Sequence, residues 1–202
     1  MITIVNYGMG NLGSLANMLR YLRIPAEVVS DPDEIARARR LILPGVGAFD
    51  AAMSRIAEVP GLREVLESKA LHERVPVLGV CLGMQLLTHG SDEGTRPGLG
   101  WIPARAQRFP AADGIKVPHM GWNVASPSIA SPLTRGIGPA TRYYFVHSYF
   151  VLVEDPAHSV MRSRHGVEFD AAIAKDNVFG VQFHPEKSHH FGMAILRNFA
   201  AI

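Results

Sequence analysis

The sequence predicts an α/β protein, a three-layer α/β/α sandwich around a central sheet that is mixed but mostly parallel. The first half of the chain alternates short apolar runs with helical repeats, which is typical of parallel strands joined by helices. The second half contains short strands with brief connections, which indicates antiparallel additions to the sheet. The 202 residues are 48% hydrophobic and 19% charged, so they suit one domain, residues 1–202, with a substantial core.

The first half supports the parallel sheet element by element. Leucine and alanine recur at helical spacing between residues 12 and 22, after a first apolar strand. Strand–helix–strand units connect by right-handed crossovers, so the strands should run parallel with helices on both faces. The expected strands are 2–5, 26–30, 41–43 and 75–80, and the expected later helices are 48–57 and 61–73.

The second half contains five further strand patterns. An amphipathic helix over residues 189–201 is expected to close the chain. Ligands of open α/β sheets bind beyond the carboxyl ends of the strands, so a site is expected at the end of strand 75–80. The five strand patterns cover residues 101–109, 142–153, 158–164, 169–174 and 178–183.

The only cysteine of the chain, Cys81, lies between Gly79 and Gly83 at an expected strand-to-helix turn. Residues 84–89 have helix-forming character and end at Gly90, a suitable C-cap. Glycines permit a sharp turn, and a helix N-terminus beneath the sulfur favours a thiolate. These features predict a nucleophile elbow. The alternative is a buried cysteine that only fills space.

A second reactive group is expected about a hundred residues later, where Pro185 ends a strand directly after His184. Glu186 follows two residues on. Together with Cys81 these residues complete a triad, in which His184 accepts the thiol proton and Glu186 orients the imidazole. The alternative for the His-Pro-Glu sequence is a surface turn. The elbow and the turn together are much more specific than either alone.

Six sequence blocks resemble the class I glutamine amidotransferases. Among these enzymes, the chain is most similar to the glutaminase subunits of imidazole glycerol phosphate synthases, which serve histidine biosynthesis. The elbow and His-Pro-Glu blocks are typical of the superfamily, whereas the Pro-Gly-Val-Gly and Pro-His-Met-Gly-Trp-Asn blocks indicate the subfamily. No position that the chemistry requires departs from the pattern. The blocks are residues 6–12, 43–49, 79–85, 116–123, 144–149 and 180–188.

The resemblance implies hydrolysis of glutamine to glutamate and ammonia through a thioester on Cys81. Ammonia is mostly ammonium at neutral pH, so its acceptor must lie close by and be shielded from water. No acceptor-binding segment is evident in the chain, so a partner is expected. The resemblance implies a (β/α)8-barrel cyclase that makes imidazole glycerol phosphate and an aminoimidazole carboxamide ribotide, with weak hydrolysis in its absence. It also implies partner contacts from Asn11, Trp122 and Lys187, although an indole is also common in cores.

Thioester formation requires N–H donors for the oxyanion of the tetrahedral intermediate. The backbone N–H of Leu82, directly after the nucleophile, is the first candidate. The second is expected from Gly45, Val46 and Gly47, where glycines allow a peptide to turn its N–H inward. A plain strand-to-helix turn is the alternative for these glycines. The resemblance implies that this segment shifts its donor into place when the partner binds.

The α-amino or carboxylate end of glutamine needs its own contacts. Gln85 lies one helical turn after Cys81 and faces the same side, so it is the first candidate. A structural strand position remains an alternative for His147. The resemblance implies backbone contacts to the same end of the substrate from His147, Ser148 and Tyr149.

Residues 8–13 match the dinucleotide fingerprint G-x-G-x-x-G between a strand and a helix. Asp31 lies near the end of the next strand, where an acidic ribose ligand is expected. A nicotinamide-dependent oxidoreductase is therefore the strongest rival interpretation. It would leave the triad unexplained and little chain for a substrate domain, and the same block belongs to the amidotransferase resemblance.

Two alternatives lie closer to the resemblance. One is a glutaminase subunit of another synthase, such as anthranilate or pyridoxal phosphate synthase. The Pro-His-Met-Gly-Trp-Asn and His-Pro-Glu-Lys-Ser sequences argue against it. The other is a non-catalytic docking subunit, against which the intact triad argues.

Composition and patterning exclude several further classes. A formal net charge of +2 gives no reason to expect a nucleic acid or an acidic membrane as partner. The longest apolar stretch, residues 75–87, is too short to span a bilayer. One cysteine fits a reducing compartment, and the N-terminus lacks a signal peptide, so a cytoplasmic protein, or a plastid one in a plant, is expected. The nine histidines show no clear ligand spacing, and neither a metal nor a cofactor is expected.

Overall fold

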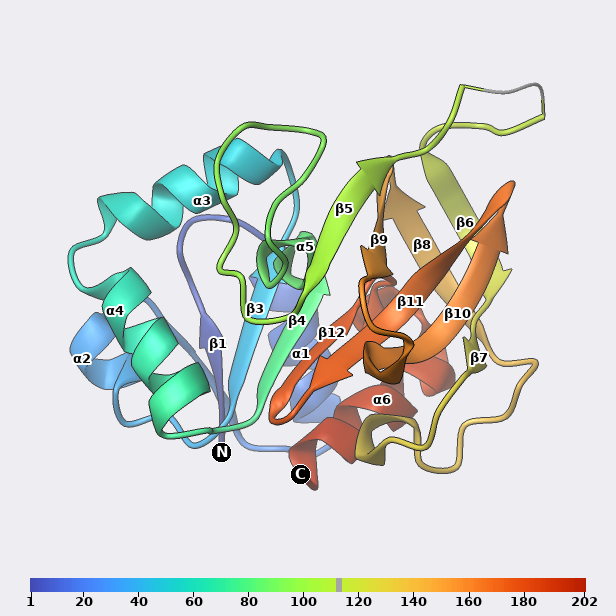
Figure 1. The fold of residues 1–202 in the computed structure, drawn as a ribbon. Coiled ribbons are helices and arrows are strands. Elements are labelled where there is room, and N and C mark those ends of the chain that lie inside the picture. The colour runs from blue at the N-terminus through green and yellow to red at the C-terminus, as the bar shows by residue number, and fades with distance from the viewer. Residues whose placement is uncertain (112–113) are drawn as a thin grey trace.

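Five parallel strands form one half of the central sheet in the computed structural model, which describes residues 1–111 and 114–202 (Figure 1). Each strand is short and almost entirely buried, except β2 at the edge. Their pairing confirms the parallel sheet predicted for the first half of the chain. In spatial order they are β2 (Ala26–Val29), β1 (Ile2–Val5), β3 (Leu41–Gly45), β4 (Val77–Cys81) and β12 (Val178–Val181).

Antiparallel strands extend the sheet beyond β12. Next to it lie β11 (Val167–Lys175), β10 (Ser159–His165) and β7 (Ser126–Pro127), in that order. A branch leaves β11 through β9 (Tyr149–Val153), which pairs with β5 (Ala104–Arg108). The predicted mixed sheet is therefore confirmed, with its antiparallel part in the second half of the chain.

A separate two-stranded sheet pairs β6 (His119–Val124) with β8 (Arg142–His147). The predicted continuous strand over 142–153 is wrong, because β8 and β9 belong to different sheets. Alternate residues are buried from Tyr143 to His147, and this alternation breaks at Tyr149, directly after the chain changes sheet. The sequence pattern did not predict β6, whose side chains at Met120 and Trp122 are exposed.

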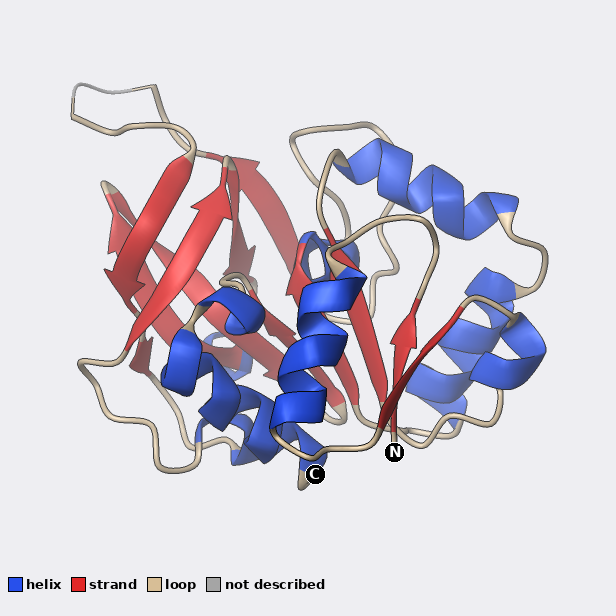
Figure 2. Ribbon diagram, turned by 180° about the vertical axis from the view of Figure 1, so that it is seen from behind, coloured by secondary structure: helices blue, strands red, loops and turns tan. Residues whose placement is uncertain are grey.

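Helices cover both faces of the sheet and complete the three predicted layers (Figures 1 and 2). On one face, Leu15 and Leu19 of α1 (Leu12–Tyr21) share a buried cluster with residues of α6 (His189–Ala200). The other buried cluster contains side chains of α2 (Pro32–Ile35), α3 (Phe49–Glu58), α4 (Leu62–Glu67) and α5 (Leu82–Leu86). The predicted helix over 61–73 is α4 followed by one π-helical turn, Ser68–His72.

The helix α5 ends at Leu86, four residues before the predicted cap at Gly90. The carbonyl of Leu86 accepts the N–H of Leu99 at 2.8 Å, and that of Leu87 accepts the N–H of Trp101 at 2.9 Å. A distant loop thus takes the acceptors that further helical turns would need. The loop and the short helix form one wall of the site described below.

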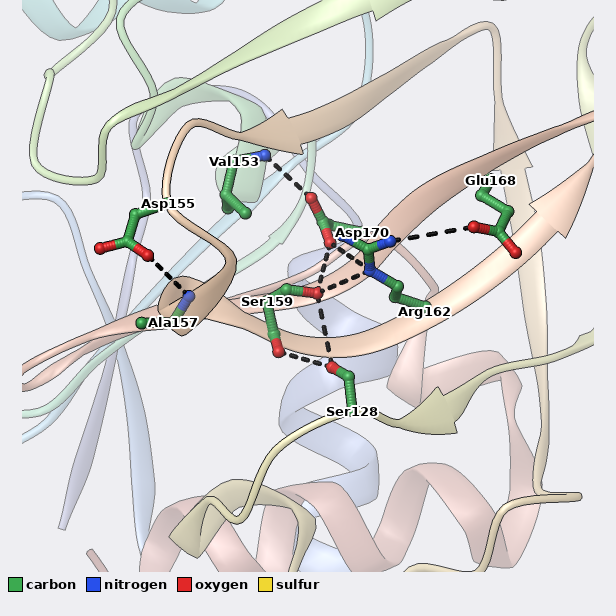
Figure 3. A network of polar contacts seen from close by, with 8 residues as sticks. All are labelled: Ser128, Val153, Asp155, Ala157, Ser159, Arg162, Glu168 and Asp170. Atoms are coloured by element: carbon green, nitrogen blue, oxygen red, sulfur yellow. Dashed lines mark hydrogen bonds and ion pairs between the residues drawn. The ribbon is translucent and has the colours of Figure 1, made fainter.

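A buried carboxylate ties the antiparallel strands together (Figure 3). Asp170 of β11 is 1% exposed, and it accepts the N–H of Val153 of β9 at 2.8 Å and the hydroxyl of Ser159 of β10 at 2.5 Å. Arg162 lies 3.6 Å from the same carboxylate and supplies the opposite charge. Because the carboxylate is hydrogen-bonded and paired, its burial is compatible with a stable fold.

None of the helices in the described part of the chain is long and apolar enough to cross a membrane.

Candidate active site

The predicted strand-to-helix turn is present at Cys81, which ends β4 and caps the N-terminus of α5. Its backbone has φ +54° and ψ −110°, a conformation that a residue with a side chain rarely adopts. The glycines on either side are required by packing. A Cβ at Gly79 would lie 2.6 Å from the carbonyl oxygen of Gly83, and a Cβ at Gly83 would lie 1.8 Å from that of Leu43.

Cys81 is 6% exposed, and its sulfur contacts two polar groups. It lies 3.9 Å from the carbonyl oxygen of Val146, and the side-chain Nε2 of Gln182 donates to it at 3.7 Å. Tyr7 is also close: burial, together with the charge of Cys81, raises the pKa of its phenol above the ordinary value. The Tyr7 hydroxyl donates to the carbonyl of Pro44 at 2.6 Å, so it remains a neutral donor.

His184 and Glu186 form a buried pair beside the cysteine. His184 precedes the 3-10 turn Pro185–Lys187, and its Nδ1 lies 2.8 Å from Oε1 of Glu186. Burial alone would lower the pKa of His184, but Cys81 and Glu186 outweigh it and raise that pKa to about 10. Nε2 of His184 is buried and has no hydrogen-bond partner among the described residues.

A cavity of about 340 Å³ opens over Cys81 and His184. The structure thus brings the three predicted triad residues to one place. Most of the predicted oxyanion and substrate residues line this cavity, namely Val46, Gly47, Leu82, Gln85, His147, Ser148 and Tyr149. Gly45 does not line it, but is aligned with Cys81 across β3 and β4, where a Cβ would stand 2.9 Å from Leu82 Cβ.

Gln85 is oriented by two hydrogen bonds. Its Nε2 donates to the carbonyl of Tyr149 at 3.1 Å and to Oε1 of Gln182 at 3.2 Å. Both amide hydrogens are therefore used, and Oε1 is the group left for a ligand. That oxygen suits the α-ammonium group of an amino acid rather than its carboxylate.

The ring of His147 does not point its nitrogens at a ligand. Nδ1 lies 2.8 Å from the carbonyl oxygen of Tyr149, and Nε2 lies 2.9 Å from Nδ1 of His119. Burial lowers the pKa of His147 to about 3. The side chain is therefore structural, as the alternative interpretation of the sequence allowed, while its backbone still lines the cavity.

The three residues expected to contact a partner are exposed. Asn11 caps α1 by accepting the N–H of Ser14 at 3.3 Å. Trp122 is 38% exposed and stacks on His189 with ring centres 5.5 Å apart, so a core position for this indole is wrong. Lys187 lies over the ring of Tyr144 at 5.9 Å and also lines the cavity, which joins this surface to the site.

The glycine-rich segment 8–13 has a structural explanation. Gly8 and Gly10 have positive φ, and a Cβ at Gly10 would lie 3.2 Å from Cβ of Pro44. The loop therefore packs against the end of β3. Asp31, the expected ribose ligand, caps α2 by accepting the N–H of Asp33 at 2.8 Å.

Two polar residues of the site were not predicted. Glu93 lines the cavity, and its Oε2 accepts the N–H of Phe49 at the start of α3 at 2.8 Å. It lies in an irregular loop, where the sequence carries no periodic signal. Gln182 had a detectable signal, because it is the one polar residue of an otherwise apolar run, 178–183, which the structure buries completely. Within the described residues no cluster of His, Cys, Asp or Glu is arranged to hold a metal ion.

The site combines a strained cysteine at a strand end with a buried His–Glu pair, and comparison with known families identifies the class of protein that has this fold and site. The family model for "Glutamine amidotransferase class-I" matches residues 3–202. The chain therefore belongs to the class-I glutamine amidotransferase family, and the glycine-rich segment falls within that match.

Individual relatives show which members of the family the chain is similar to. The chain is 51% identical to "Imidazole glycerol phosphate synthase subunit HisH" of Bdellovibrio bacteriovorus, with 100% of both proteins covered. It is 48% identical to "Imidazole glycerol phosphate synthase subunit HisH 2" of Pseudomonas aeruginosa, again with 100% of both covered. A solved glutamine amidotransferase shares the fold with a TM-score of 0.77 at 18% identity, covering 100% of this chain and 99% of that one.

Proposed function

We propose that this chain is the glutaminase subunit of an imidazole glycerol phosphate synthase. It would hydrolyse glutamine to glutamate and ammonia and pass the ammonia to a cyclase partner in histidine biosynthesis. The observation that supports this best is that Cys81, at its positive φ, and His184 line one cavity, while Glu186 contacts the imidazole of His184. Full-length identity of 47–51% to three synthase subunits named HisH supports the choice of synthase.

The first half of the proposed reaction forms a thioester. Cys81 transfers its proton to His184 and attacks the side-chain amide carbon of glutamine. The imidazolium, stabilised by Glu186 at 2.8 Å, then gives a proton to the departing ammonia. Its pKa, raised to about 10, lets His184 hold the proton that it has accepted until ammonia departs.

The second half releases glutamate. His184, neutral again after ammonia leaves, removes a proton from water, which attacks the thioester carbon, and Cys81 leaves as thiolate. In both halves an oxyanion forms where the cavity is lined by Leu82, Val46 and Gly47. We assign oxyanion stabilisation to the backbone N–H of Leu82 and to an N–H of the segment Gly45 to Gly47.

The rest of the cavity would hold the amino-acid end of glutamine. The free Oε1 of Gln85 and the carboxylate of Glu93 are acceptors suited to the α-ammonium group. Backbone groups of Ser148 and Tyr149 would complete this end. The side chain of His147 would take no direct part, since both its nitrogens already have partners.

The partner would be a (β/α)8-barrel cyclase that covers the surface next to the cavity. That surface combines exposed apolar groups with a cation, which is suitable for a specific interface. Its members are Asn11, Met120, Trp122, Tyr144 and Lys187. We also propose a cytoplasmic location, because a nucleophilic thiol has to remain reduced.

A covalent trap tests the catalytic assignment without the partner. A diazoketone analogue of glutamine should alkylate Cys81 with loss of dinitrogen and add the remaining mass to the peptide that contains residues 79–85, and glutamine in excess should protect against it. The Gln85→Leu variant should be alkylated more slowly, because the analogue carries the same α-ammonium group, while its circular dichroism stays unchanged. A chain whose only thiol ignores the analogue, yet reacts with iodoacetamide, would contradict the proposed function.

A further inference from the structure

The carbonyl oxygen of Tyr149 joins two chains of hydrogen bonds, which we call arms. It accepts from Nδ1 of His147 at 2.8 Å and from Nε2 of Gln85 at 3.1 Å. A carbonyl can only accept, so both side chains must present an N–H to it. This single backbone group therefore fixes the orientation of the Gln85 amide and the tautomer of His147.

The first arm runs to the nucleophile. The amide nitrogen of Gln85 also donates to Oε1 of Gln182 at 3.2 Å, so Gln182 must turn its own nitrogen the other way. That nitrogen donates to the sulfur of Cys81 at 3.7 Å. Gln182 is 0% exposed, so it has no water to replace these partners.

The second arm runs outward to β6. Since Nδ1 of His147 is the donor in the neutral ring, its Nε2 accepts, and Nδ1 of His119 donates to it at 2.9 Å. Nε2 of His119 then accepts from Nδ2 of Asn123 at 3.1 Å. Two backbone groups hold Asn123: its Nδ2 donates to the carbonyl of Arg164 at 2.9 Å, and its Oδ1 accepts the N–H of Val124 at 2.8 Å.

Both imidazoles remain neutral, as this polarity requires. Burial is the main cause, and neighbouring histidines add to it, so that the pKa is lowered to about 4 for His119 and to about 3 for His147. The donors and acceptors therefore have one consistent direction from Asn123 to Tyr149 near neutral pH. Aromatic stacking of His119 on Phe145, with ring centres 4.8 Å apart, holds the ring in place.

We propose that Gln182 orients and stabilises the thiolate of Cys81, and that the hydrogen-bonded arms from Asn123 to Gln182 are the device that holds its amide in place. Gln182 contacts a reacting atom, whereas His119 and Asn123 are positioning residues that act through others. The inference rests on the proposed role of Cys81 as the nucleophile.

The direction of the effect follows from the two groups at the sulfur. An N–H from Gln182 stabilises the thiolate, whereas the carbonyl of Val146 can accept only from the protonated thiol. Of these two groups, removal of the Gln182 donor leaves the one that favours the thiol. The variants described below leave the other titratable residues around the sulfur unsubstituted. These residues are Tyr7, Glu93, His147, His184, Glu186 and Lys187.

The test is the pH profile of iodoacetamide alkylation, followed on the intact chain. Cys81 is the only cysteine, so every alkylation event reports this sulfur. Gln182→Leu should move the midpoint of the profile upward by about one pH unit, which is about tenfold in rate on its lower limb. The matched control is Gln107→Leu, on half-buried β5, which should leave the profile unchanged.

Asn123→Ala tests the distant end of the arms. It also provides an independent test if Gln182→Leu does not fold. It should shift the midpoint in the same direction by less, because each intervening bond passes on only part of a perturbation. In the Gln182→Leu background it should add nothing, since the arm then has no amide to orient. An unchanged midpoint in both single variants, or a fully additive double variant, would overturn the proposal.

These readouts are independent of the proposed function. Alkylation needs neither glutamine nor a partner, so a shifted midpoint in a chain without glutaminase activity would support the arms and contradict the function. Glutaminase activity with an unshifted midpoint would support the function and contradict the role of the arms. In active enzyme, loss of Gln182 should lower kcat, through its direct contact with the nucleophile, more than it raises KM, through its indirect contact with the substrate by way of Gln85.

Discussion

At the scale of single residues, the reactivity of the site depends on charges placed close together in a dry environment. His184 is 2% exposed and Glu186 is 4% exposed at the side chain, yet the two form one 2.8 Å contact. Oε2 of Glu186 is buried with no hydrogen-bond partner among the described residues. Cys81 and then this carboxylate raise the pKa of His184 against the opposing effect of burial.

Replacement of Glu186 by Gln tests this electrostatic role. The neutral amide should lower the pKa of His184 from about 10 and reduce kcat by about 10²–10⁴-fold. Because the folded state raises the pKa of His184, protonation of this residue stabilises the fold. This stabilisation is complete below about pH 6.5 and disappears as the pH rises towards 10, and in the variant it should be smaller and disappear at a lower pH. Histidine NMR titration and urea unfolding between pH 6 and 10 measure both effects. A His184 pKa that does not move would contradict the assignment.

Gly47 tests the proposed oxyanion segment. It has φ +109°, and a Cβ there would lie 2.9 Å from Cε of Met9. Gly47→Ala should displace the segment and lower kcat by about 10²–10³-fold, with a smaller effect on KM. Steady-state kinetics of glutamate release measure this. The control is Gly138→Ala, whose φ is not positive and whose nearest neighbour is 4.0 Å away. Equal rates for both variants would remove this segment from the mechanism.

At the scale of elements, the elbow exists because α5 packs directly on the end of β3. No side chain fits at Gly83, since its Cβ would overlap the carbonyl oxygen of Leu43 at 1.8 Å. Gly83→Ala should therefore force the helix off the sheet and cost on the order of 3 kcal/mol or more in unfolding free energy.

The matched control for that variant is Gly13→Ala. Gly13 lies in α1 without a positive φ, and no atom lies within 4 Å of its Cβ position, so alanine there should stabilise slightly. Urea unfolding of both variants makes the comparison. Gly83→Ala as stable as Gly13→Ala would show that the elbow does not depend on this contact.

Strand and helix patterns predicted most elements, because the parallel core is apolar throughout and its helices are amphipathic. The pair β6–β8 was not predicted as a sheet. Gly121 interrupts the sequence pattern of β6, and the exposed side chains Met120 and Trp122 of this strand do not form an inward apolar face. The elbow and the His184–Glu186 pair were predicted because they are local in sequence. Glu93 and the arms through His119 were not, because only tertiary contacts bring them to the site.

At the scale of the whole molecule, the cavity and the exposed aromatic surface are adjacent. Lys187 belongs to both, and Trp122 lies against His189 at the start of α6. A partner placed on this surface would therefore cover the exit of the cavity. Such a position would let ammonia pass to the proposed partner without release to water.

Trp122→Ala tests the proposed interface. The exposed indole should contribute to binding rather than to folding, so affinity for the cyclase should fall by roughly tenfold or more. Thermal unfolding should change little. Tyr21→Ala is the matched control, because Tyr21 is 74% exposed at the opposite end of α1 from Asn11. Calorimetric titration with the cyclase that finds equal affinities for both variants would place the interface elsewhere.

The most direct test of the whole account is glutamate release from glutamine by the purified chain, alone and with a histidine-pathway cyclase and its ribotide ligand. Cys81→Ala is the control. The account predicts weak release by the chain alone, strong activation by the loaded cyclase, and no release in either mixture with Cys81→Ala. Release that is the same with and without the cyclase, or that persists without the Cys81 thiol, would contradict it.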